Sequence, residues 1–282
     1  MSGKLLVIGT PLGNLDDISH RALEALRSVD LIACEDTRRT SRLLDHFGIR
    51  TPLVSCHRFN ERARLEGLLR RVRQGQVVGL VTDSGTPAVA DPGSTLVCAA
   101  LDEGLEVHPV PGPSAVTALL SVSGFSADRF VFDGFLPHRA GERRRRLREL
   151  RPERRTIVVF ETPHRIVATL RDIEQVLGER PLVLGRELSK LHETILRGPA
   201  AQLALRLGDS VRGEITLVIG GAPAGDAAGT LDDAAGEVLQ VWREALSAST
   251  DDPRTALRAA SRRLGLSRSE LKRRLMELGA DR

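Results

Sequence analysis

Aromatic side chains are scarce in this 282-residue chain, which contains seven phenylalanines, one tryptophan and no tyrosine. Proteins that hold single-stranded nucleic acid without reading its sequence stack successive bases on several aromatic rings. With aromatic residues at 3% of the chain, an extensive stacking surface of that kind is excluded. A nucleic-acid partner would instead be recognised through shape, phosphate charge and ribose 2′-hydroxyl contacts.

Cysteine is equally rare. Cys34, Cys56 and Cys98 are far apart and form no CxxC pair, so neither a disulfide framework nor a zinc site is indicated. Each lies in or beside an apolar run, and we expect all three to be small buried hydrophobic residues. The sequence predicts no metal site.

Long apolar runs and phosphate-binding signatures are also missing. No stretch reaches the roughly 20 apolar residues that a membrane-spanning helix needs, and the opening MSGKLLVIGT has no signal-peptide layout. We therefore expect a cytoplasmic protein with no membrane partner. The motifs GxGxxG and GxxxxGK[ST] are absent, so neither a dinucleotide-binding fold nor a P-loop ATPase is supported.

Positive charge is concentrated in two segments of a chain whose net charge is only +4. Residues 139–155 contain nine arginines against three glutamates, and residues 254–282 contain nine basic residues against three acidic ones. Each segment carries +6, which leaves −8 for the remainder. Two basic segments on an acidic body are typical of docking surfaces for a polyanion. The alternative is two solvated helix faces.

Part of the first basic segment is expected to be a helix. If Leu147 and Leu150 turn inward, Arg143, Arg144 and Arg146 would face solvent. Such a helix meets phosphates without reading bases.

Residues 1–111 alternate short apolar runs with amphipathic segments, the pattern of parallel strands joined by helices. Ser19 is placed to cap one helix, and Gly48 to end another. The predicted strands are residues 5–8, 31–34, 53–55, 77–81 and 107–110. This is an N-terminal α/β domain.

Residues 112–222 predict a second α/β domain, with strands at 130–132, 157–160, 182–184, 194–196 and 215–219. The later strands follow one another closely, which favours a mixed sheet with hairpins.

The chain beyond the second domain differs in composition. Residues 222–229 are small and indicate a linker. Residues 231–282 then predict a small basic helical domain, in which Ser267 and Glu270 form a capping box and arginines lie on the outer faces. A short helical hairpin is either a packing unit or a nucleic-acid contact, and the charge favours RNA.

Three loops rich in glycine and proline follow strands of the first domain: residues 9–14, 82–93 and 110–118. Open α/β sheets hold their ligands at the carboxyl ends of strands, where irregular loops expose backbone amides and carbonyls. We expect the three loops to converge on one crevice. A tight turn alone would require the same glycines in the first loop.

Seven motifs, taken in order, closely resemble the ribosomal RNA small subunit methyltransferase I family, which has the tetrapyrrole methylase fold. They are GTPLGNLDDIS, IACEDTRRTSRLL, VTDSGTPAVADPG, PGPSAVTALL, GF at 134–135, FETPHRI and GRELSKLHET. The match covers residues 5 to about 220, and the C-terminal helices resemble the family's smaller extra domain.

The resemblance implies a two-domain α/β, class III methyltransferase with a small C-terminal helical domain. It implies S-adenosylmethionine as cofactor and a cytidine ribose 2′-hydroxyl in the decoding region of 16S rRNA as acceptor. It also implies a homodimer.

The resemblance further implies a cofactor cleft between the domains, lined largely by backbone. The implied cofactor-binding residues are Pro11, Gly13, Asp83, Gly85, Thr86, Pro87, Ser114, Ala115 and Phe160. Asp83 would either balance the ligand's ammonium or sulfonium, or cap its own loop.

A ribose hydroxyl is a weak acid, so a nearby base assists its methylation. Candidates in the motifs are Glu35, Asp36, Glu161, His164, Glu187 and Lys190. We predict Glu161 and Glu187 as catalytic residues because both follow strands of the second domain. Pairing with Arg165 and Arg186 to hold loops together is the alternative reading.

The run Glu35–Thr40 follows the second strand and begins a helix. Arg38 and Arg39 are placed there either to meet phosphates or to form surface ion pairs.

Two other functions stay open. A tetrapyrrole such as uroporphyrinogen bears many carboxylates, so basic charge also suits a C-methyltransferase of the same fold, although two separated basic segments are wider than such a molecule. The other is a non-catalytic RNA-binding assembly protein, against which the intact cleft loops argue.

Overall fold

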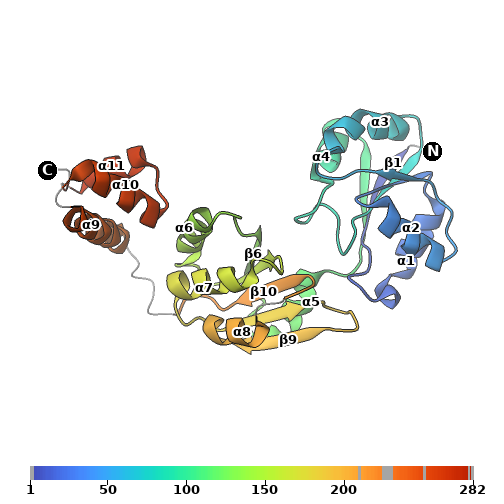
Figure 1. Ribbon diagram of the computed structural model, residues 1–282. Helices are drawn as coiled ribbons and strands as arrows, with labels where there is room; N and C mark the ends of the chain where they lie inside the picture. Colours follow the sequence, from blue (N-terminus) through green and yellow to red (C-terminus); the bar gives the residue numbers. More distant parts are fainter. Residues whose placement is uncertain (1–2, 209–210, 224–230, 250–251, 279, 281–282) are drawn as a thin grey trace. The chain divides into compact units, whose positions relative to one another are not determined.

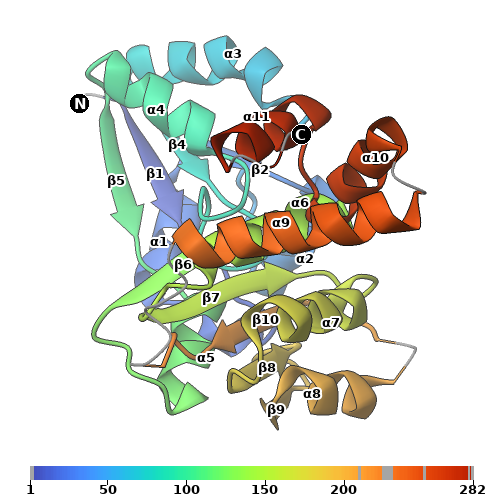
Figure 2. The same ribbon diagram turned by 90° about the vertical axis from the view of Figure 1, so that its left-hand side faces the viewer.

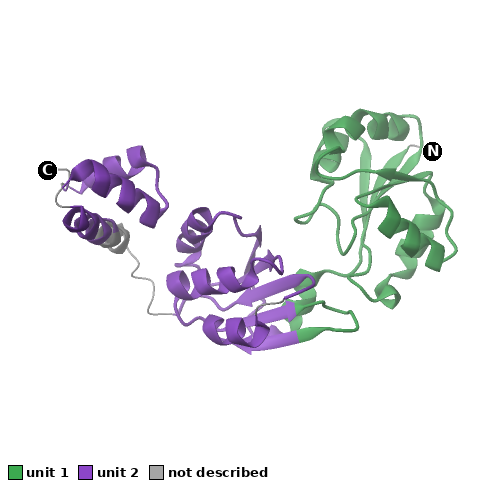
Figure 3. Cartoon of the chain, in the orientation of Figure 1, with its two compact units in different colours: residues 1–122, 186–194 green, residues 123–185, 195–282 purple. Residues whose placement is uncertain are grey.

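The computed structural model describes residues 3–208, 211–223, 231–249, 252–278 and 280. The chain forms two compact units (Figure 3). Unit 1 comprises Met1–Val122 and Arg186–Thr194, and unit 2 comprises Ser123–Gly185 and Ile195–Arg282. Most of the predicted linker, residues 224–229, lies outside the described residues. The boundaries expected at 111, 222 and 231 stay predictions of independently folding domains.

Unit 1 contains a five-stranded parallel sheet in the order β3-β2-β4-β1-β5. Its strands are β1 (Lys4–Ile8), β2 (Leu31–Cys34), β3 (Leu53–Ser55), β4 (Val77–Leu80) and β5 (Glu106–Val110). The central strands are continuous apolar runs because helices cover both faces of a parallel sheet. The parallel α/β arrangement predicted from the sequence is confirmed.

The helices of unit 1 cover the two faces of its sheet (Figure 1). They are α1 (His20–Ser28), α2 (Thr37–His46), α3 (Glu61–Arg73) and α4 (Ser94–Asp102). Unit 1 also contains a 3-10 turn, η1 (Leu15–Asp17), and all but the last residue of α5 (Ala115–Ser123). Alternate residues of β2 point to opposite faces. Ala33 packs in the cluster that includes α3 and α4, and Ile32 in the cluster that includes α1 and α2. The Ser19 hydroxyl accepts the amide of Ala22 at 3.1 Å, which confirms the predicted cap.

Unit 2 contains a mixed sheet in the order β6-β7-β10-β8-β9. Its strands are β6 (Phe130–Phe135), β7 (Thr156–Glu161), β8 (Leu182–Arg186), β9 (Thr194–Gly198) and β10 (Ile215–Ile219). β7 pairs parallel with β6 and antiparallel with β10, which confirms the mixed sheet. Helices α6 (Ala140–Leu150), α7 (Ile166–Leu177) and α8 (Ala200–Leu207) contribute to one apolar core with the sheet.

Three helices, α9 (Leu231–Ala248), α10 (Pro253–Leu264) and α11 (Arg268–Glu277), pack together in unit 2 (Figures 1 and 2). They share a hydrophobic cluster that includes Trp242 and Leu271. The Ser267 hydroxyl accepts the amide of Glu270 at 3.2 Å, so α11 begins where the sequence predicts. Basic side chains lie on the outer faces as expected, and the exposed ones are Arg254, Arg258, Arg262, Arg263, Arg268, Lys272 and Arg273.

The basic helix α6 differs from the expectation. Leu147 and Leu150 turn inward, but Arg143 is buried with them and its guanidinium lies 2.6 Å from the carboxylate of Asp172 on α7. Arg143 precedes Leu147 by four residues, so the two occupy the same face of the helix. The prediction that Arg143 faces solvent is wrong.

The two neighbouring arginines of α6 are also engaged within unit 2. Arg144 lies 3.6 Å from the second carboxylate oxygen of Asp172. Arg146 pairs with Asp133 of β6 and with Glu149. Both side chains are only partly exposed, so they hold α6 to its neighbours. In the run 143–146, Arg145 is the exposed arginine.

One cysteine also departs from the prediction. Cys34 and Cys56 are buried as expected, but Cys98 is exposed on α4. It lies between Leu96 and Ala100, which both turn toward the sheet, so its own direction is outward. Among the described helices, none is long and apolar enough to cross a membrane.

Candidate functional site

The three glycine- and proline-rich loops contact one another in unit 1, and their convergence on one crevice stays a prediction. Thr10 and Gly85 exchange backbone hydrogen bonds of 2.8 and 3.2 Å, which join the first loop to the second. The Thr86 hydroxyl donates to the carbonyl of Pro113 at 3.4 Å, which joins the second loop to the third. The loops are therefore held by their own backbone at the carboxyl ends of β1, β4 and β5.

Two features of these loops depend on small residues. A Cβ on Gly9 would lie 2.8 Å from the Cα of Gly112, so the first and third loops pack backbone against backbone. In the second loop, Ala88 and Ala90 have φ angles of 65° and 63°, a conformation that L-residues rarely adopt. Strained backbone of this kind clusters at ligand-binding sites.

A pocket of about 220 Å³ opens beside the first loop. Its lining residues are Thr10, Pro11, Leu12, Gly13, Leu15, Arg39, Thr40, Arg42, Leu43, Thr82 and Asp83. The pocket thus brings together Pro11, Gly13 and Asp83 of the predicted cofactor residues. Its backbone and apolar surface suit a nucleoside, and its charged groups are the Asp83 carboxylate and the guanidinium groups of Arg39 and Arg42.

The Asp83 carboxylate contacts residues at the start of α2, and its capping of its own loop stays a prediction. One of its carboxylate oxygens accepts the amide of Asp36 at 3.0 Å, and the other lies 3.4 Å from Arg39. Arg38 pairs with Asp36 at 2.8 Å. These contacts attach the second loop to the start of α2, and both arginines form the surface ion pairs that the sequence left open.

Glu187 lies in the segment Arg186–Thr194, which belongs to unit 1 although β8 and β9 flank it. Its carboxylate pairs with Lys190 at 2.9 Å, whereas Arg186 donates to Thr194. The Lys190 side chain covers the first loop closely, because a Cβ on Gly13 would lie 2.0 Å from its Cγ. Glu187 is therefore placed beside the predicted cofactor loop. Its catalytic role stays a prediction.

Glu161 is enclosed in unit 2, and its side chain is 0% exposed. The carboxylate accepts hydrogen bonds from the Thr169 hydroxyl at 2.6 Å, from Arg165 at 3.1 Å and from the amide of Thr162 at 2.8 Å. These are the loop-holding contacts of the alternative reading, and a catalytic role for Glu161 stays a prediction.

Phe160, the last predicted cofactor residue, lies in a small aromatic cluster of unit 2. Its ring centroid is 5.0 Å from that of Phe132 and 5.5 Å from that of Phe135.

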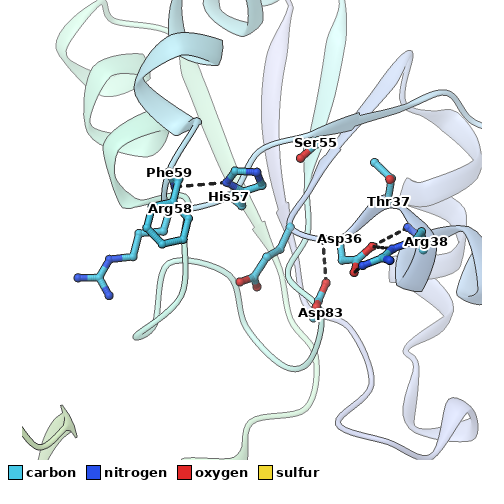
Figure 4. A pocket seen from close by; sticks show the side chains of 9 residues that line it. Asp36, Thr37, Arg38, Ser55, His57, Arg58, Phe59 and Asp83 are labelled. Carbon is cyan, nitrogen blue, oxygen red and sulfur yellow. Dashed lines mark hydrogen bonds and ion pairs between the residues drawn. The ribbon is translucent and has the colours of Figure 1, made fainter. Parts of the chain in front are cut away.

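A second pocket in unit 1 has a volume of about 450 Å³ and opens at the carboxyl ends of β2, β3 and β4. Its lining residues are Glu35, Asp36, Thr37, Arg38, Ser55, His57, Arg58, Phe59 and Asp83. Figure 4 shows Arg58 and Phe59 on one side, Asp36, Thr37 and Arg38 on the other, and His57 and Ser55 between them. Residues 55–59 were not predicted from the sequence as part of a site. The available signal was an isolated phenylalanine directly after a strand in a chain with few aromatic residues.

The electrostatics of this pocket centre on Glu35. Burial raises the pKa of Glu35 above its ordinary value, and the nearby Asp83 carboxylate raises it further. The Thr82 hydroxyl, which donates to Glu35 at 3.3 Å, opposes the shift. Glu35 therefore holds a proton more strongly than an exposed glutamate does.

Comparison with known proteins identifies the family. A family model described as Tetrapyrrole (Corrin/Porphyrin) Methylases matches residues 4–204. The ribosomal RNA small subunit methyltransferase I of Thermotoga maritima is 46% identical over 220 residues, which cover 78% of this chain and 99% of the relative. The protein of that name from Pseudomonas aeruginosa is 47% identical over 231 residues, which cover 80% of this chain and 82% of the relative.

Solved structures share the fold at lower identity. Diphthine synthase matches with a TM-score of 0.58 at 18% identity, covering 78% of this chain and 90% of its own. Uroporphyrin-III C-methyltransferase of Thermus thermophilus complexed with S-adenyl homocysteine matches with a TM-score of 0.56 at 19% identity, covering 77% and 97%. The chain therefore belongs to the ribosomal RNA small subunit methyltransferase I family, within the tetrapyrrole (corrin/porphyrin) methylases.

Proposed function

We propose that this chain methylates the ribose 2′-hydroxyl of a cytidine in the 16S rRNA of the small ribosomal subunit, with S-adenosylmethionine as donor. The observation that carries the proposal is the 46–47% identity to relatives named for this RNA, over about four fifths of the chain. The three loops lie within the residues 4–204 that match the methylase family model.

S-adenosylmethionine, when bound, supplies a methyl group on a sulfonium: the 2′-oxygen bonds to the methyl carbon, the carbon–sulfur bond breaks with its electron pair on sulfur, and the hydroxyl proton leaves. Because the donor needs no further activation, the chain contributes mainly by positioning the reactants. The acceptor is a weak acid, so a carboxylate that takes the proton adds to the rate.

The three loops are proposed to hold the cofactor. Backbone groups around Pro11, Gly13 and Gly85 would contact the nucleoside, and the Asp83 carboxylate would face the cationic tail. The role of Phe160, the predicted cofactor residue in unit 2, stays a prediction. The remaining proposed residues are Thr86, Pro87, Ser114 and Ala115 of the second and third loops.

Replacing Asp83 by alanine tests the cofactor assignment. We expect Asp83→Ala to weaken the affinity for S-adenosylmethionine about tenfold, because a charge-assisted contact is lost. Asp45→Ala is the matched control, since Asp45 lies on α2 with a side chain that is 58% exposed. Calorimetry measures the affinity and circular dichroism checks the fold. Wild-type affinity in a folded Asp83→Ala variant would remove the second loop from the site.

We propose that the exposed basic residues of α10 and α11 bind rRNA phosphates. In the first basic segment, Arg139, Arg145, Arg151, Arg154 and Arg155 are also exposed. Phosphate contacts fix position and orientation without reading sequence.

A tetrapyrrole C-methyltransferase is the second candidate. The solved tetrapyrrole methyltransferase above is only 19% identical to this chain, and that level supports the fold alone. Incubating the purified chain with labelled S-adenosylmethionine and either small subunits or uroporphyrinogen separates the two functions. We expect label in the RNA. Label only in the porphyrinogen would overturn the proposal.

Oligomeric state and location complete the proposal. We propose a homodimer that acts in the cytoplasm, where its ribosomal substrate resides. Light scattering on the purified chain would give twice the 30.7 kDa mass of one chain. A monomer mass would refute the dimer without affecting the proposed reaction.

A further inference from the structure

The cofactor assignment leaves the 450 Å³ pocket largely unused, since only Asp83 of its lining belongs to the proposed cofactor residues. We propose that this pocket receives the acceptor nucleotide in an unstacked conformation, with its base on the ring of Phe59 and its ribose 2′-hydroxyl toward Glu35. The inference rests on the proposed function and assigns its acceptor site.

The aromatic ring of Phe59 lines the pocket. Phe59 is 94% exposed in a chain with only seven phenylalanines, and among the large hydrophobic residues Leu191 and Leu205 are exposed to a similar degree. An exposed aromatic ring at the rim of a polar pocket is the surface on which a single unpaired base stacks. One ring serves one nucleotide, which agrees with a composition that excludes an extended stacking surface.

The loop that carries Phe59 is fixed by its own hydrogen bonds. The amide of His57 donates to the Asn60 side chain at 2.7 Å, and the amide of Phe59 donates to the His57 ring at 3.2 Å. Asn60 in turn donates to the carbonyl of Ser55 at 3.3 Å. These hydrogen bonds fix the backbone that carries the Phe59 ring, so less conformational entropy is lost when a base binds to it.

Polar and charged side chains also line the pocket. Glu35 follows β2 and Ser55 ends β3, so a carboxylate and a hydroxyl line the pocket beside Phe59. Hydrogen-bonding groups of this kind recognise ribose hydroxyls. At the rim, Arg58 is exposed and the Arg38 side chain is 85% exposed, which places guanidinium groups where flanking phosphates would lie.

Glu35 is proposed to accept the proton that the 2′-hydroxyl loses when its oxygen bonds to the methyl carbon. Its partial burial and the Asp83 carboxylate make Glu35 a stronger base than an exposed glutamate. Asp36 and Arg39 are the other charged groups near these two carboxylates. Glu35→Gln would keep the size of the side chain and remove the proton acceptor.

The volume agrees with this occupant, because pockets that hold small organic ligands measure about 300–1,000 Å³. The rival occupant is part of the cofactor, since Asp83 also lines the smaller pocket. Variants at Phe59 and Glu35 separate the two occupants.

The experiment uses the full chain and small subunits from cells that lack the modification. We expect Phe59→Ala to lower kcat/KM for subunits at least about tenfold, because base stacking is lost, and Phe59→Trp to restore it. Leu205→Ala, which also removes an exposed apolar side chain, 84% exposed on α8, is the control and should match wild type. Glu35→Gln should lower kcat about a hundredfold or more.

Two binding measurements complete the test. The affinity for a short single-stranded RNA that contains cytidine, followed by fluorescence anisotropy, should fall in Phe59→Ala. The affinity for S-adenosylmethionine should stay within about twofold of wild type in Phe59→Ala and Glu35→Gln.

Each contrary result has one meaning. An active wild type with unchanged kinetics and RNA affinity in Phe59→Ala would overturn the pocket assignment alone. Loss of cofactor affinity in Phe59→Ala would assign the pocket to the cofactor and overturn it too. A wild-type chain that methylates no subunit would overturn the proposed function and this inference with it.

Discussion

Replacing Arg143 by glutamine should destabilise unit 2 strongly, although the residue lies in a run of arginines that reads as a solvent-facing surface. The side chain is 5% exposed, and its guanidinium donates to Asp172 at 2.6 and 2.7 Å and to the carbonyl of His138 at 3.3 Å. Removing it leaves the Asp172 carboxylate buried with one weaker partner, Arg144 at 3.6 Å.

The magnitude follows from that geometry. Breaking a buried ion pair by removing one partner costs about 3–5 kcal/mol. Arg144 retains part of the compensation, so we expect the lower end, about 3 kcal/mol. Arg145→Gln is the matched control: the same change two residues away on the exposed face should alter stability by less than about 0.5 kcal/mol.

Urea unfolding followed by circular dichroism gives the stability difference, and amide hydrogen exchange locates it in α6 and α7. For RNA binding, Arg145 should matter and Arg143 should not. Arg145→Gln should lower the slope of log affinity against log salt by about one. If Arg143→Gln is as stable as Arg145→Gln and lowers the salt slope equally, the buried-pair reasoning is refuted.

At pH 8 a thiol reagent should label Cys98 alone in the folded chain, since Cys34 is buried and burial raises the pKa of Cys56 to about 11; rapid labelling of two or three thiols would contradict this. The hydrogen bonds that Glu153 accepts lower its pKa to about 2, so its contribution to stability is present above pH ~4.5 and is lost as the pH falls toward 2. Glu153→Gln should reduce this acid-induced decrease in the free energy of unfolding by less than about 1 kcal/mol. An acid unfolding curve identical to that of wild type would contradict this prediction. Deleting residues 231–282 should leave the affinity for S-adenosylmethionine within about twofold of wild type and weaken RNA binding. If the truncated chain modifies small subunits at the full rate, these helices have a structural role and do not bind the RNA.

Much of the fold could be predicted because it follows from local rules. Apolar runs gave the strands of both sheets, and Ser19 and Ser267 marked the starts of their helices. The contact among the three loops also followed, because the carboxyl ends of parallel strands share one edge of a sheet.

The details that could not be predicted depend on contacts between distant segments. Arg143 is buried because Asp172, on another helix, compensates its charge. The segment around Glu187 belongs to unit 1 although the strands that flank it form the sheet of unit 2. The four-residue spacing between Arg143 and Leu147 does predict that the two share a helix face, but it does not supply Asp172, the partner that compensates the buried charge.

The larger pocket was missed for a related reason. Glu35 stood among the candidates, but Ser55, His57 and Phe59 have no motif of their own, and only the order β3-β2-β4 places them beside Glu35 and Asp83. Because β3, β2 and β4 are neighbours in the sheet, their three carboxyl ends form one site although they are far apart in the sequence.

Nucleoside mass spectrometry of 16S rRNA would show directly whether the chain methylates a cytidine ribose. Small subunits that lack the modification would be incubated with the purified chain and S-adenosylmethionine, and the RNA then digested and mapped. The proposed function predicts one 2′-O-methylated cytidine, absent without the chain. A methyl group on a base atom, or RNA without a new methyl group while a porphyrinogen is methylated, would contradict it.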